Sequence, residues 1–288
     1  MSELTGLANE RLRLVQMLCG EDLASEQTAK LATDEQQKSL KKAIFQGAAQ
    51  SANFIYLIID RETNACACVD ACWDTEGLLH IIHSLELELV AALYTHRHSD
   101  HTGGRYSDQV RLEGLSNLAI SGVPTYVGDA DVESTVEQCA LGEMVPRVRG
   151  LSDGDIIQVG GLQVRAILTA GHTPGGVCYA VGGDDISGDA DVEAIITGDT
   201  LFVGAFGRVD LDHSDPDAMF ESLQRLSRLP DRVAVLPGHN YGSARMSRIG
   251  DERATNVGFR CRSRQQFRIL SGAGTISPPP FAIARVDR

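Results

Sequence analysis

Seven histidine and aspartate side chains carry the strongest chemical signal in this sequence. They are His96, His98, Asp100, His101, His172, Asp199 and His239. The first four form one H-x-H-x-D-H segment. With eight histidines in 288 residues, such a segment arises by chance on the order of one time in a few thousand. Imidazole and carboxylate donors without thiolates suit Zn(II), Fe(II) or Mn(II), so the sequence predicts a metal site.

Five imidazoles and two carboxylates exceed what one tetrahedral ion uses, so the set predicts two adjacent metals. Our assignment gives three donors to each metal and one to both: His96, His98 and His172 on the first, Asp100, His101 and His239 on the second, and Asp199 as the bridge. Two metals about 3.5–4 Å apart can share a hydroxide, because bound water falls to a pKa of about 7. That hydroxide is the expected nucleophile, and Asp100 and Asp199 are the expected catalytic carboxylates.

Each donor segment follows a short apolar run with the character of a β-strand. The runs are Leu89–Tyr94, Val164–Leu168, Ala194–Thr197 and Val233–Leu236. Ligands of open α/β sheets bind beyond the carboxyl ends of the strands, so the four following loops are expected to meet in one cleft. Taken singly, the three later donors would be ordinary loop residues. Their shared position at strand ends is what makes them candidates.

From about residue 43 to residue 240, short and often β-branched apolar runs alternate with Gly, Asp, Asn and Pro. This pattern is typical of an α/β domain. We expect a hairpin from Phe54–Asp60 and Ala65–Val69, and helices over Thr75–Leu85 and Pro216–Leu229. Residues 105–150 separate the first and second donor loops and have the character of an insertion, which we interpret as a lid or a substrate wall.

Residues 1–42 are expected to form a helical extension. Apolar residues recur there at three- and four-residue steps between Leu4 and Leu18, which is the spacing of one helix face. A second helix is expected from Asp34. The segment Thr33-x-x-Gln36 fits a capping box at its start, with Leu40, Ala43 and Ile44 facing inward.

Composition excludes several classes of function. The chain has 26 Lys and Arg against 39 Asp and Glu, a net charge of −13, which argues against a general binder of nucleic acid or anionic membranes. Its longest apolar runs have six residues, far fewer than the roughly 20 of a membrane helix. Seven cysteines without a secretion signal predict reduced thiols and a cytoplasmic protein. We likewise interpret Cys66-x-Cys68-x-x-x-Cys72 as plain thiols, because no second cysteine pair exists to complete a metal knuckle.

The four donor motifs resemble those of a known family. They are His96-x-His98-x-Asp100-His101, Gly171-His172-Thr173-Pro174-Gly175, Thr197-Gly198-Asp199-Thr200-Leu201-Phe202 and Gly238-His239-x-Tyr241. This combination resembles the metallo-β-lactamase superfamily over residues 43–258, in the branch that holds glyoxalase II and the persulfide dioxygenases. The resemblance implies an α/β fold, an αββα sandwich of two mixed sheets with helices outside. It also supports the metal assignment at each position.

Within that branch the resemblance implies two alternative activities. The glyoxalase II alternative is a hydrolase with two Zn²⁺ per chain, or Fe or mixed Zn/Fe, that cleaves a small glutathione-type thioester such as S-lactoylglutathione. The persulfide dioxygenase alternative has a single Fe(II) on His96, His172 and Asp199 and oxidises glutathione persulfide. Gly207-Arg208-Val209-Asp210 departs from the glyoxalase II pattern, and only 49 residues follow His239 where that family has a helical domain. We favour the thioester hydrolase.

Residues 259–288 are expected to form a basic C-terminal tail. The segment 244–288 holds nine arginines and three acids, a net charge of +6, and ends near the Pro278-Pro279-Pro280 run. Glutathione carries two carboxylates, which arginine binds with a bidentate fork. The candidate substrate-binding residues are Arg208, Tyr241, Arg260, Arg262 and Arg264. The alternative for the tail arginines is ion pairing with the acidic body of the protein.

Overall fold

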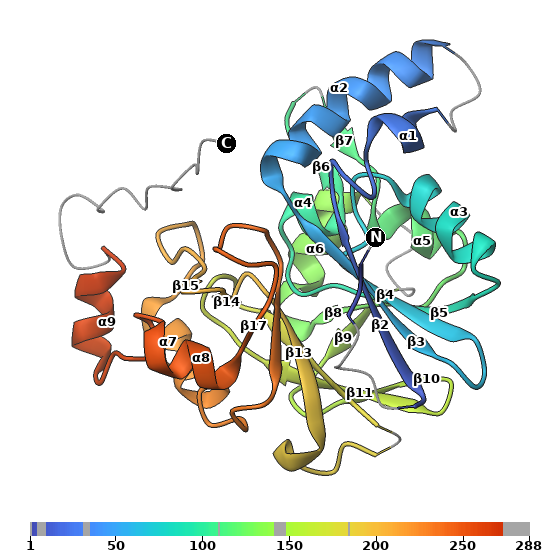
Figure 1. The fold of residues 1–288 in the computed structure, drawn as a ribbon. Helices are drawn as coiled ribbons and strands as arrows, with labels where there is room; N and C mark the ends of the chain where they lie inside the picture. The colour runs from blue at the N-terminus through green and yellow to red at the C-terminus, as the bar shows by residue number, and fades with distance from the viewer. Residues whose placement is uncertain are drawn as a thin grey trace.

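A computed structural model describes residues 2–4, 10–30, 35–108, 110–140, 148–183 and 185–272. In these residues two mixed β-sheets lie face to face, and helices cover the outer surface of each sheet (Figure 1). The predicted fold class, a four-layer αββα sandwich, is confirmed.

The first sheet has its strands in the order β1-β2-β3-β4-β5-β8-β9. They are β1 (Ser2–Glu3), β2 (Leu12–Leu18), β3 (Phe54–Asp60), β4 (Ala65–Val69), β5 (Glu88–Leu93), β8 (Thr125–Gly128) and β9 (Val148–Leu151). Strands β3 and β4 form the predicted antiparallel hairpin. All seven residues of β3 are buried, because one face packs on the second sheet and the other packs on helices. Burial on both faces explains why β3 is one continuous apolar run.

The second sheet has the order β10-β11-β12-β13-β16-β17. Its strands are β10 (Ile156–Val159), β11 (Leu162–Leu168), β12 (Val177–Gly182), β13 (Val192–Gly198), β16 (Ala234–Pro237) and β17 (Ser247–Arg248). Only the β13–β16 pair is parallel. Two short hairpins lie outside both sheets: β6 (Gly104–Arg105) with β7 (Arg111–Leu112), and β14 (Leu201–Phe202) with β15 (Ala205–Phe206).

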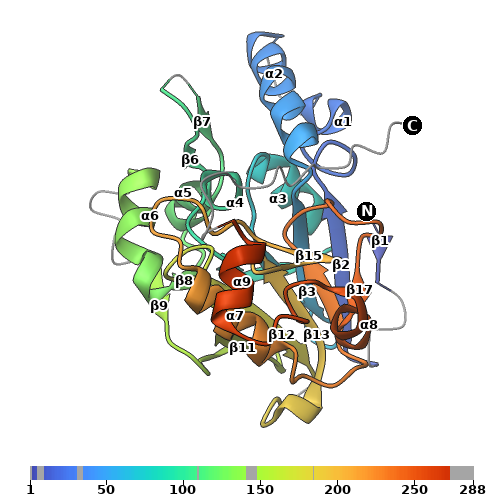
Figure 2. The same cartoon turned by 90° about the vertical axis from the view of Figure 1, so that its left-hand side faces the viewer.

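Helices form the two outer layers. In the described residues these are α1 (Glu26–Ala29), α2 (Glu35–Ser51), α3 (Thr75–Ser84), α4 (Ser99–Thr102), α5 (Leu115–Ile120), α6 (Val132–Cys139), α7 (Pro216–Leu226), α8 (Ile249–Thr255) and α9 (Arg264–Leu270). Helices α2, α3 and α5 contribute to the core on the outer face of the first sheet. Helices α7 and α9 lie side by side over the second sheet (Figure 2), where Leu223 and Phe267 join its core.

The predicted helical extension over residues 1–42 is wrong in its first half. Residues Leu12–Leu18 form β2, which pairs along its whole length with β3 in the first sheet. Leu12 and Leu14 face the second sheet, whereas Val15 and Met17 face the helices. Apolar residues on both faces of a strand also satisfy three- and four-residue spacing, so the spacing alone could not separate the two structures.

The second predicted helix exists but runs further and faces differently than expected. Helix α2 ends at Ser51, past the proposed domain boundary at residue 42. Of the three residues expected to face inward, Ile44 packs against the core, whereas Leu40 is 61% exposed and Ala43 is also exposed. Phe45 and Ala48 are the buried residues of this face. Thr33 and Asp34, with the expected capping box, lie outside the described residues.

Two other boundaries also change. Residues 105–150 supply β8 and β9 to the first sheet, so these two strands belong to the sandwich, whereas the β6–β7 hairpin lies outside both sheets. Phe259, Cys261 and Phe267 are buried in the core on the second sheet, so the start of the proposed tail belongs to the domain. The Pro278-Pro279-Pro280 run lies outside the described residues.

All seven cysteines are unpaired and buried, in agreement with the expected reduced thiols. Burial raises the pKa of Cys66 to about 12 and those of Cys139 and Cys178 to about 11. These thiols are therefore protonated and unreactive at neutral pH. None of the helices in the described part of the chain has the length and apolar character needed to cross a bilayer.

Candidate metal centre

The structure brings all seven predicted donors together at one edge of the sandwich. Strands β11, β13 and β16 run in the same direction, so their carboxyl ends lie at the same edge of the second sheet. His172, Asp199 and His239 follow these three ends. The other four donors follow β5 of the first sheet, two of them on the short helix α4. The site therefore joins both sheets.

The donors form three overlapping groups of three, of which His96, His101 and Asp199 link the other two. His96, His98 and His172, the first triad, approach closely, because His98 Nδ1 lies 3.0 Å from both His96 Nε2 and His172 Nε2. In the second triad, of Asp100, His101 and His239, the two Nε2 atoms are 3.1 Å apart.

Asp199 lies between the two triads. Its Oδ1 is 3.5 Å from His101 Nε2 and 3.3 Å from His239 Nε2, whereas its Oδ2 is 3.6 Å from His172 Nε2. One carboxylate thus presents an oxygen to each triad. This is the arrangement expected of a bridging ligand.

Four of the histidines use Nδ1 for a hydrogen bond and aim Nε2 at the centre. His172 Nδ1 donates to the carbonyl of Arg208 at 2.8 Å, and His239 Nδ1 donates to the carbonyl of Ser51 at 2.7 Å. His101 Nδ1 donates to Asp70 at 2.9 Å. His96 Nδ1 lies 3.1 Å from the Thr95 hydroxyl, whose own proton goes to Asp70. These hydrogen bonds turn the four Nε2 atoms toward one another, which is the orientation in which histidine binds metals.

Two observations test whether metal ions fit these residues. Asp199 Oδ1 is buried and accepts no hydrogen bond, an expensive state for a carboxylate oxygen. The Nε2 atoms of His101 and His239 lie 3.1 Å apart, and, despite burial, the carboxylates of Asp100 and Asp199 raise the pKa of His101 to about 10, so this pair of rings favours a positive charge between them. Cations among the donors resolve both features, so the donor set fits a pair of divalent metals.

The protonation states of His96, His98 and Asp199 suit metal binding directly, whereas nearby carboxylates raise the pKa of His101 to about 10 despite its burial, so this ring must release a proton when a metal binds. Burial lowers the pKa of His98 to about 4 and holds that of His96 well below its usual range. Burial alone would raise the pKa of Asp199, but the adjacent His239 and His101 hold it well below its usual value. At neutral pH these two imidazoles are neutral and the Asp199 carboxylate is ionised, which are the forms that bind a metal.

Sequence reasoning missed two buried aspartates that organise the donor loops. Asp70 accepts hydrogen bonds from the Thr95 backbone and hydroxyl, both at 2.7 Å, as well as from His101. Asp131 accepts from the Thr173 hydroxyl at 2.6 Å and from the Arg97 N–H at 3.1 Å, so it joins the first two donor loops. Asp70 directly follows β4, so the strand-end rule could have found it. Asp131 follows no predicted strand end.

The structure places two of the substrate-binding candidates beside the centre. The Tyr241 ring stacks on His239, with 4.5 Å between ring centroids and 8° between planes, and its side chain is 43% exposed. Arg208 accepts the His172 hydrogen bond through its carbonyl, while its exposed guanidinium pairs with Asp210 at 2.9 Å.

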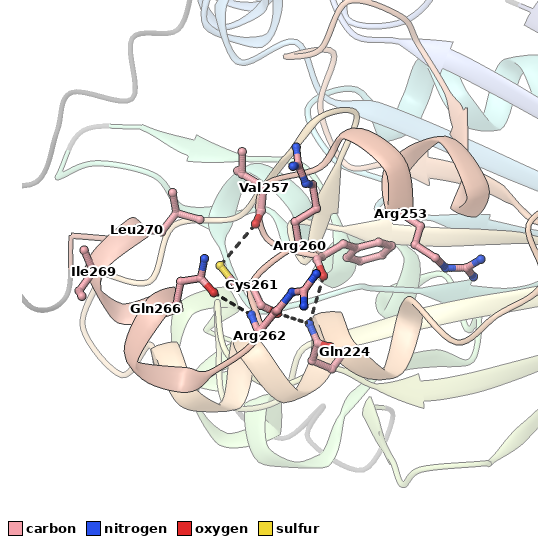
Figure 3. Close-up of a pocket in the computed structure, with 10 residues that line it drawn as sticks. Gln224, Arg253, Val257, Arg260, Cys261, Arg262, Gln266, Ile269 and Leu270 are labelled. Carbon is pink, nitrogen blue, oxygen red and sulfur yellow. Dashed lines mark hydrogen bonds between the residues drawn. The ribbon is translucent and has the colours of Figure 1, made fainter.

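The other three substrate-binding candidates, Arg260, Arg262 and Arg264, lie beside the helices that cover the second sheet. Arg260 and Arg262 line a pocket of about 850 Å³ with residues of α7, α8 and α9 (Figure 3), and none of the seven donors lines it. Arg264 pairs with Glu221 of α7 at 2.9 Å. Ion pairing with the acidic body, the alternative interpretation, thus applies to Arg264.

Comparisons with known proteins give the same family as the motifs. The sequence model described as "Metallo-beta-lactamase superfamily" matches residues 142–239. A hydroxyacylglutathione hydrolase of Rhodospirillum rubrum is 30% identical over 238 residues, covering 83% of this chain and 81% of the relative. The "Probable polyketide biosynthesis zinc-dependent hydrolase BaeB" of Bacillus velezensis is 29% identical, covering 75% of this chain and 85% of the relative.

A solved structure supports the same relationship. The crystal structure described as "TTHA1623 in a di-iron-bound form" superposes with a TM-score of 0.53 at 30% identity, covering 72% of this chain and 95% of that one. With its two-sheet sandwich and its donors at the strand ends, the chain belongs to the metallo-β-lactamase superfamily of metal-dependent hydrolases.

Proposed function

We propose that the protein is a binuclear metallohydrolase that cleaves small glutathione-type thioesters of the S-lactoylglutathione class. The observation that carries this proposal is Asp199, whose two oxygens face the two triads and whose buried Oδ1 has no hydrogen-bond partner. A single iron on His96, His172 and Asp199 would leave the second triad without a metal. Two complete triads joined by one carboxylate favour two metals.

The similar proteins support the substrate class and the metal. The relative named hydroxyacylglutathione hydrolase spans most of this chain, and its name specifies a glutathione thioester. Another relative is named as zinc-dependent, and a similar structure holds two irons. We therefore propose two Zn²⁺ per chain, with Fe or a mixed Zn/Fe pair as the variant.

In the proposed enzyme the first triad would hold one metal ion and the second triad would hold the other. Asp199 would contribute a ligand to both ions. Bound ions of this kind lower the pKa of water to about 7 and polarise a carbonyl group. The chain's own part begins with the Nδ1 hydrogen bonds that orient four of the five histidine donors. Asp100 and Asp199 remain ionised beside the reacting groups, because neighbouring histidines hold the pKa of both below its usual value despite burial.

Substrate binding would use residues around the centre. The exposed face of Tyr241 beside His239 offers a flat apolar surface for the substrate. Arg208 offers an exposed guanidinium to a substrate carboxylate, in exchange for its pairing with Asp210. We also propose Arg260, Arg262 and Arg264 as a more distant cationic surface for anionic thiol conjugates.

The test combines metal content with turnover. Protein purified without added metal would be analysed by elemental mass spectrometry and then assayed for loss of S-lactoylglutathione and release of free thiol. We expect about two metal ions per chain and thioester hydrolysis. One iron per chain, no thioester turnover and oxygen uptake with glutathione persulfide would overturn the proposal in favour of the mononuclear dioxygenase.

A further inference from the structure

The second triad borders the C-terminus of α2. Ser51 is the last residue of this helix, so its carbonyl has no partner within the helix. That carbonyl accepts the hydrogen bond from His239 Nδ1 at 2.7 Å. The Ser51 hydroxyl donates to Asp100 Oδ2 at 3.3 Å. One residue at a helix end therefore contacts two of the three donors of the second triad.

Asn53, two residues further on, contacts the remaining donor. Its amide nitrogen lies 3.4 Å from His101 Nε2 and 3.5 Å from Asp100 Oδ2. The backbone of this segment also bridges to His239, which ties the first sheet to the last donor loop. Ser51 and Asn53 together contact all three donors of the second triad.

The orientation of the Asn53 amide is set by Trp73. The indole Nε1–H donates to Asn53 Oδ1 at 2.9 Å, so the amide oxygen faces Trp73 and the NH₂ group must face the donors. Asn53 is 1% exposed and Trp73 is 2% exposed. The Asn53 amide thus donates to Asp100 and contacts His101 at the same time, which holds these two donors in their converged arrangement.

The first triad is supported differently. His96 bonds to Thr95, and His172 bonds to the Arg208 carbonyl. None of the hydrogen bonds among the described residues joins Ser51, Asn53 or Trp73 to this triad. Support from the end of α2 is therefore specific to the second triad.

We propose that Ser51, Asn53 and Trp73 are positioning residues that set the affinity of the second metal position. On this view the docking of α2 decides whether the centre holds one metal or two. The inference rests on the proposed binuclear centre. It predicts that the two positions can be separated by substitutions that change no metal ligand.

The test measures Zn²⁺ stoichiometry and affinity by competition with a chromophoric chelator, with elemental mass spectrometry after dialysis. Ser51→Ala removes the hydroxyl, Asn53→Leu removes the amide, and Trp73→Phe removes the indole N–H together with part of the buried ring. For Asn53→Leu we expect the weaker Zn²⁺ to lose about 10- to 100-fold in affinity, as for other residues that orient ligands. The tighter Zn²⁺ should be unchanged. Ser51→Ala and Trp73→Phe should shift the same ion by a smaller factor.

Ser222→Ala serves as the matched control, because its hydroxyl bonds to the Ala170 carbonyl and to none of the donors. It should keep two Zn²⁺ at wild-type affinity. Should Asn53→Leu fail to fold, as judged by circular dichroism, the two milder variants carry the test. Two Zn²⁺ at wild-type affinity in the folded variants would overturn the inference, as would equal weakening of both ions or a wild type that binds only one. Thioester turnover by the wild type tests the proposed function separately.

Discussion

At the scale of single residues, the tautomer of each histidine donor depends on the group that accepts its Nδ1–H hydrogen bond. Four histidines give Nδ1–H to an acceptor, and two of those acceptors are backbone carbonyls, of Ser51 and Arg208. A carbonyl cannot be altered by changing its side chain. The tautomers of His239 and His172 therefore depend on the path of the backbone as well as on residue types.

Replacing Asp199 with asparagine should remove the bridge. The neutral amide keeps the shape of the carboxylate but cannot present a charged oxygen to each triad. We expect fewer than two metals per chain by elemental mass spectrometry and a fall in kcat/KM of at least about 100-fold. Asp212→Asn, at an exposed carboxylate, is the control and should leave both values unchanged. Two metals in the Asp199 variant would contradict the bridging role.

Replacing Arg260, Arg262 and Arg264 together with alanine tests the distant cationic surface. If these residues bind substrate carboxylates, KM for anionic thiol conjugates should rise about tenfold, because a hydrogen bond to a charged group contributes about 1.5–3 kcal/mol. Metal content should not change. Arg268→Ala is the matched control on α9, the helix that also carries Arg264, since that arginine pairs with Asp217. An unchanged KM in the triple variant would remove these residues from the substrate site.

At the scale of elements, contacts between the two sheets hold the strand ends in place. Asp60, at the end of β3, is fully buried. Its carboxylate accepts hydrogen bonds from Arg11 Nε at 2.9 Å and from the Thr63 hydroxyl at 2.8 Å. It also accepts the Gly161 N–H at 2.8 Å, from the turn between β10 and β11 of the other sheet. One carboxylate thus connects both sheets at the edge opposite the carboxyl end of β11.

Replacing Asp60 with asparagine should destabilise the fold by about 3 kcal/mol, because Arg11 loses a buried partner. The Arg11 guanidinium holds the pKa of Asp60 well below its usual value in the folded state. The carboxylate therefore contributes stability above the unfolded-state pKa of about 4, and that contribution is lost as the pH falls through the lower folded-state pKa. Urea unfolding at pH 7 and pH 3 should show a smaller difference between wild type and variant at pH 3. An equal difference at both pH values would contradict this account.

At the scale of the whole molecule, the metal centre couples binding to stability. Seven candidate donors from both sheets converge at one edge, so metal bound there would hold the two sheets together. A ligand that binds only the folded state stabilises it by about 4 kcal/mol at a free concentration 1,000 times its Kd.

Removing the metal should therefore lower Tm by roughly 10 °C, since 1 kcal/mol shifts Tm by about 2–4 °C in a domain of this size. Calorimetry before and after dialysis against a chelator would measure the change. Adding Zn²⁺ back should restore the original Tm, which separates metal loss from irreversible damage. A Tm that does not change after the metal has been removed would argue against a centre that spans both sheets.

Much of the fold and the candidate site was accessible from the sequence. The hairpin of β3 and β4, the strand β11 and the start of α7 follow from local apolar runs bounded by turn residues. The seven donors were found because their types and spacing are rare and because each group follows a strand. Such signals are local, and local pattern is what a sequence records most directly.

The tertiary structure alone decided the rest. Leu12–Leu18 became a strand because β3 offered it hydrogen bonds and because the sandwich buries both of its faces, neither of which its spacing reveals. Ser51 and Asn53 contact the second triad because α2 ends beside the last donor loop. Ser51 and His239 of that loop are 188 residues apart in the chain. The sequence by itself determined which groups could bind a metal. Packing between distant segments determined how those groups are aimed, because hydrogen-bond partners and burial depend on neighbours in space.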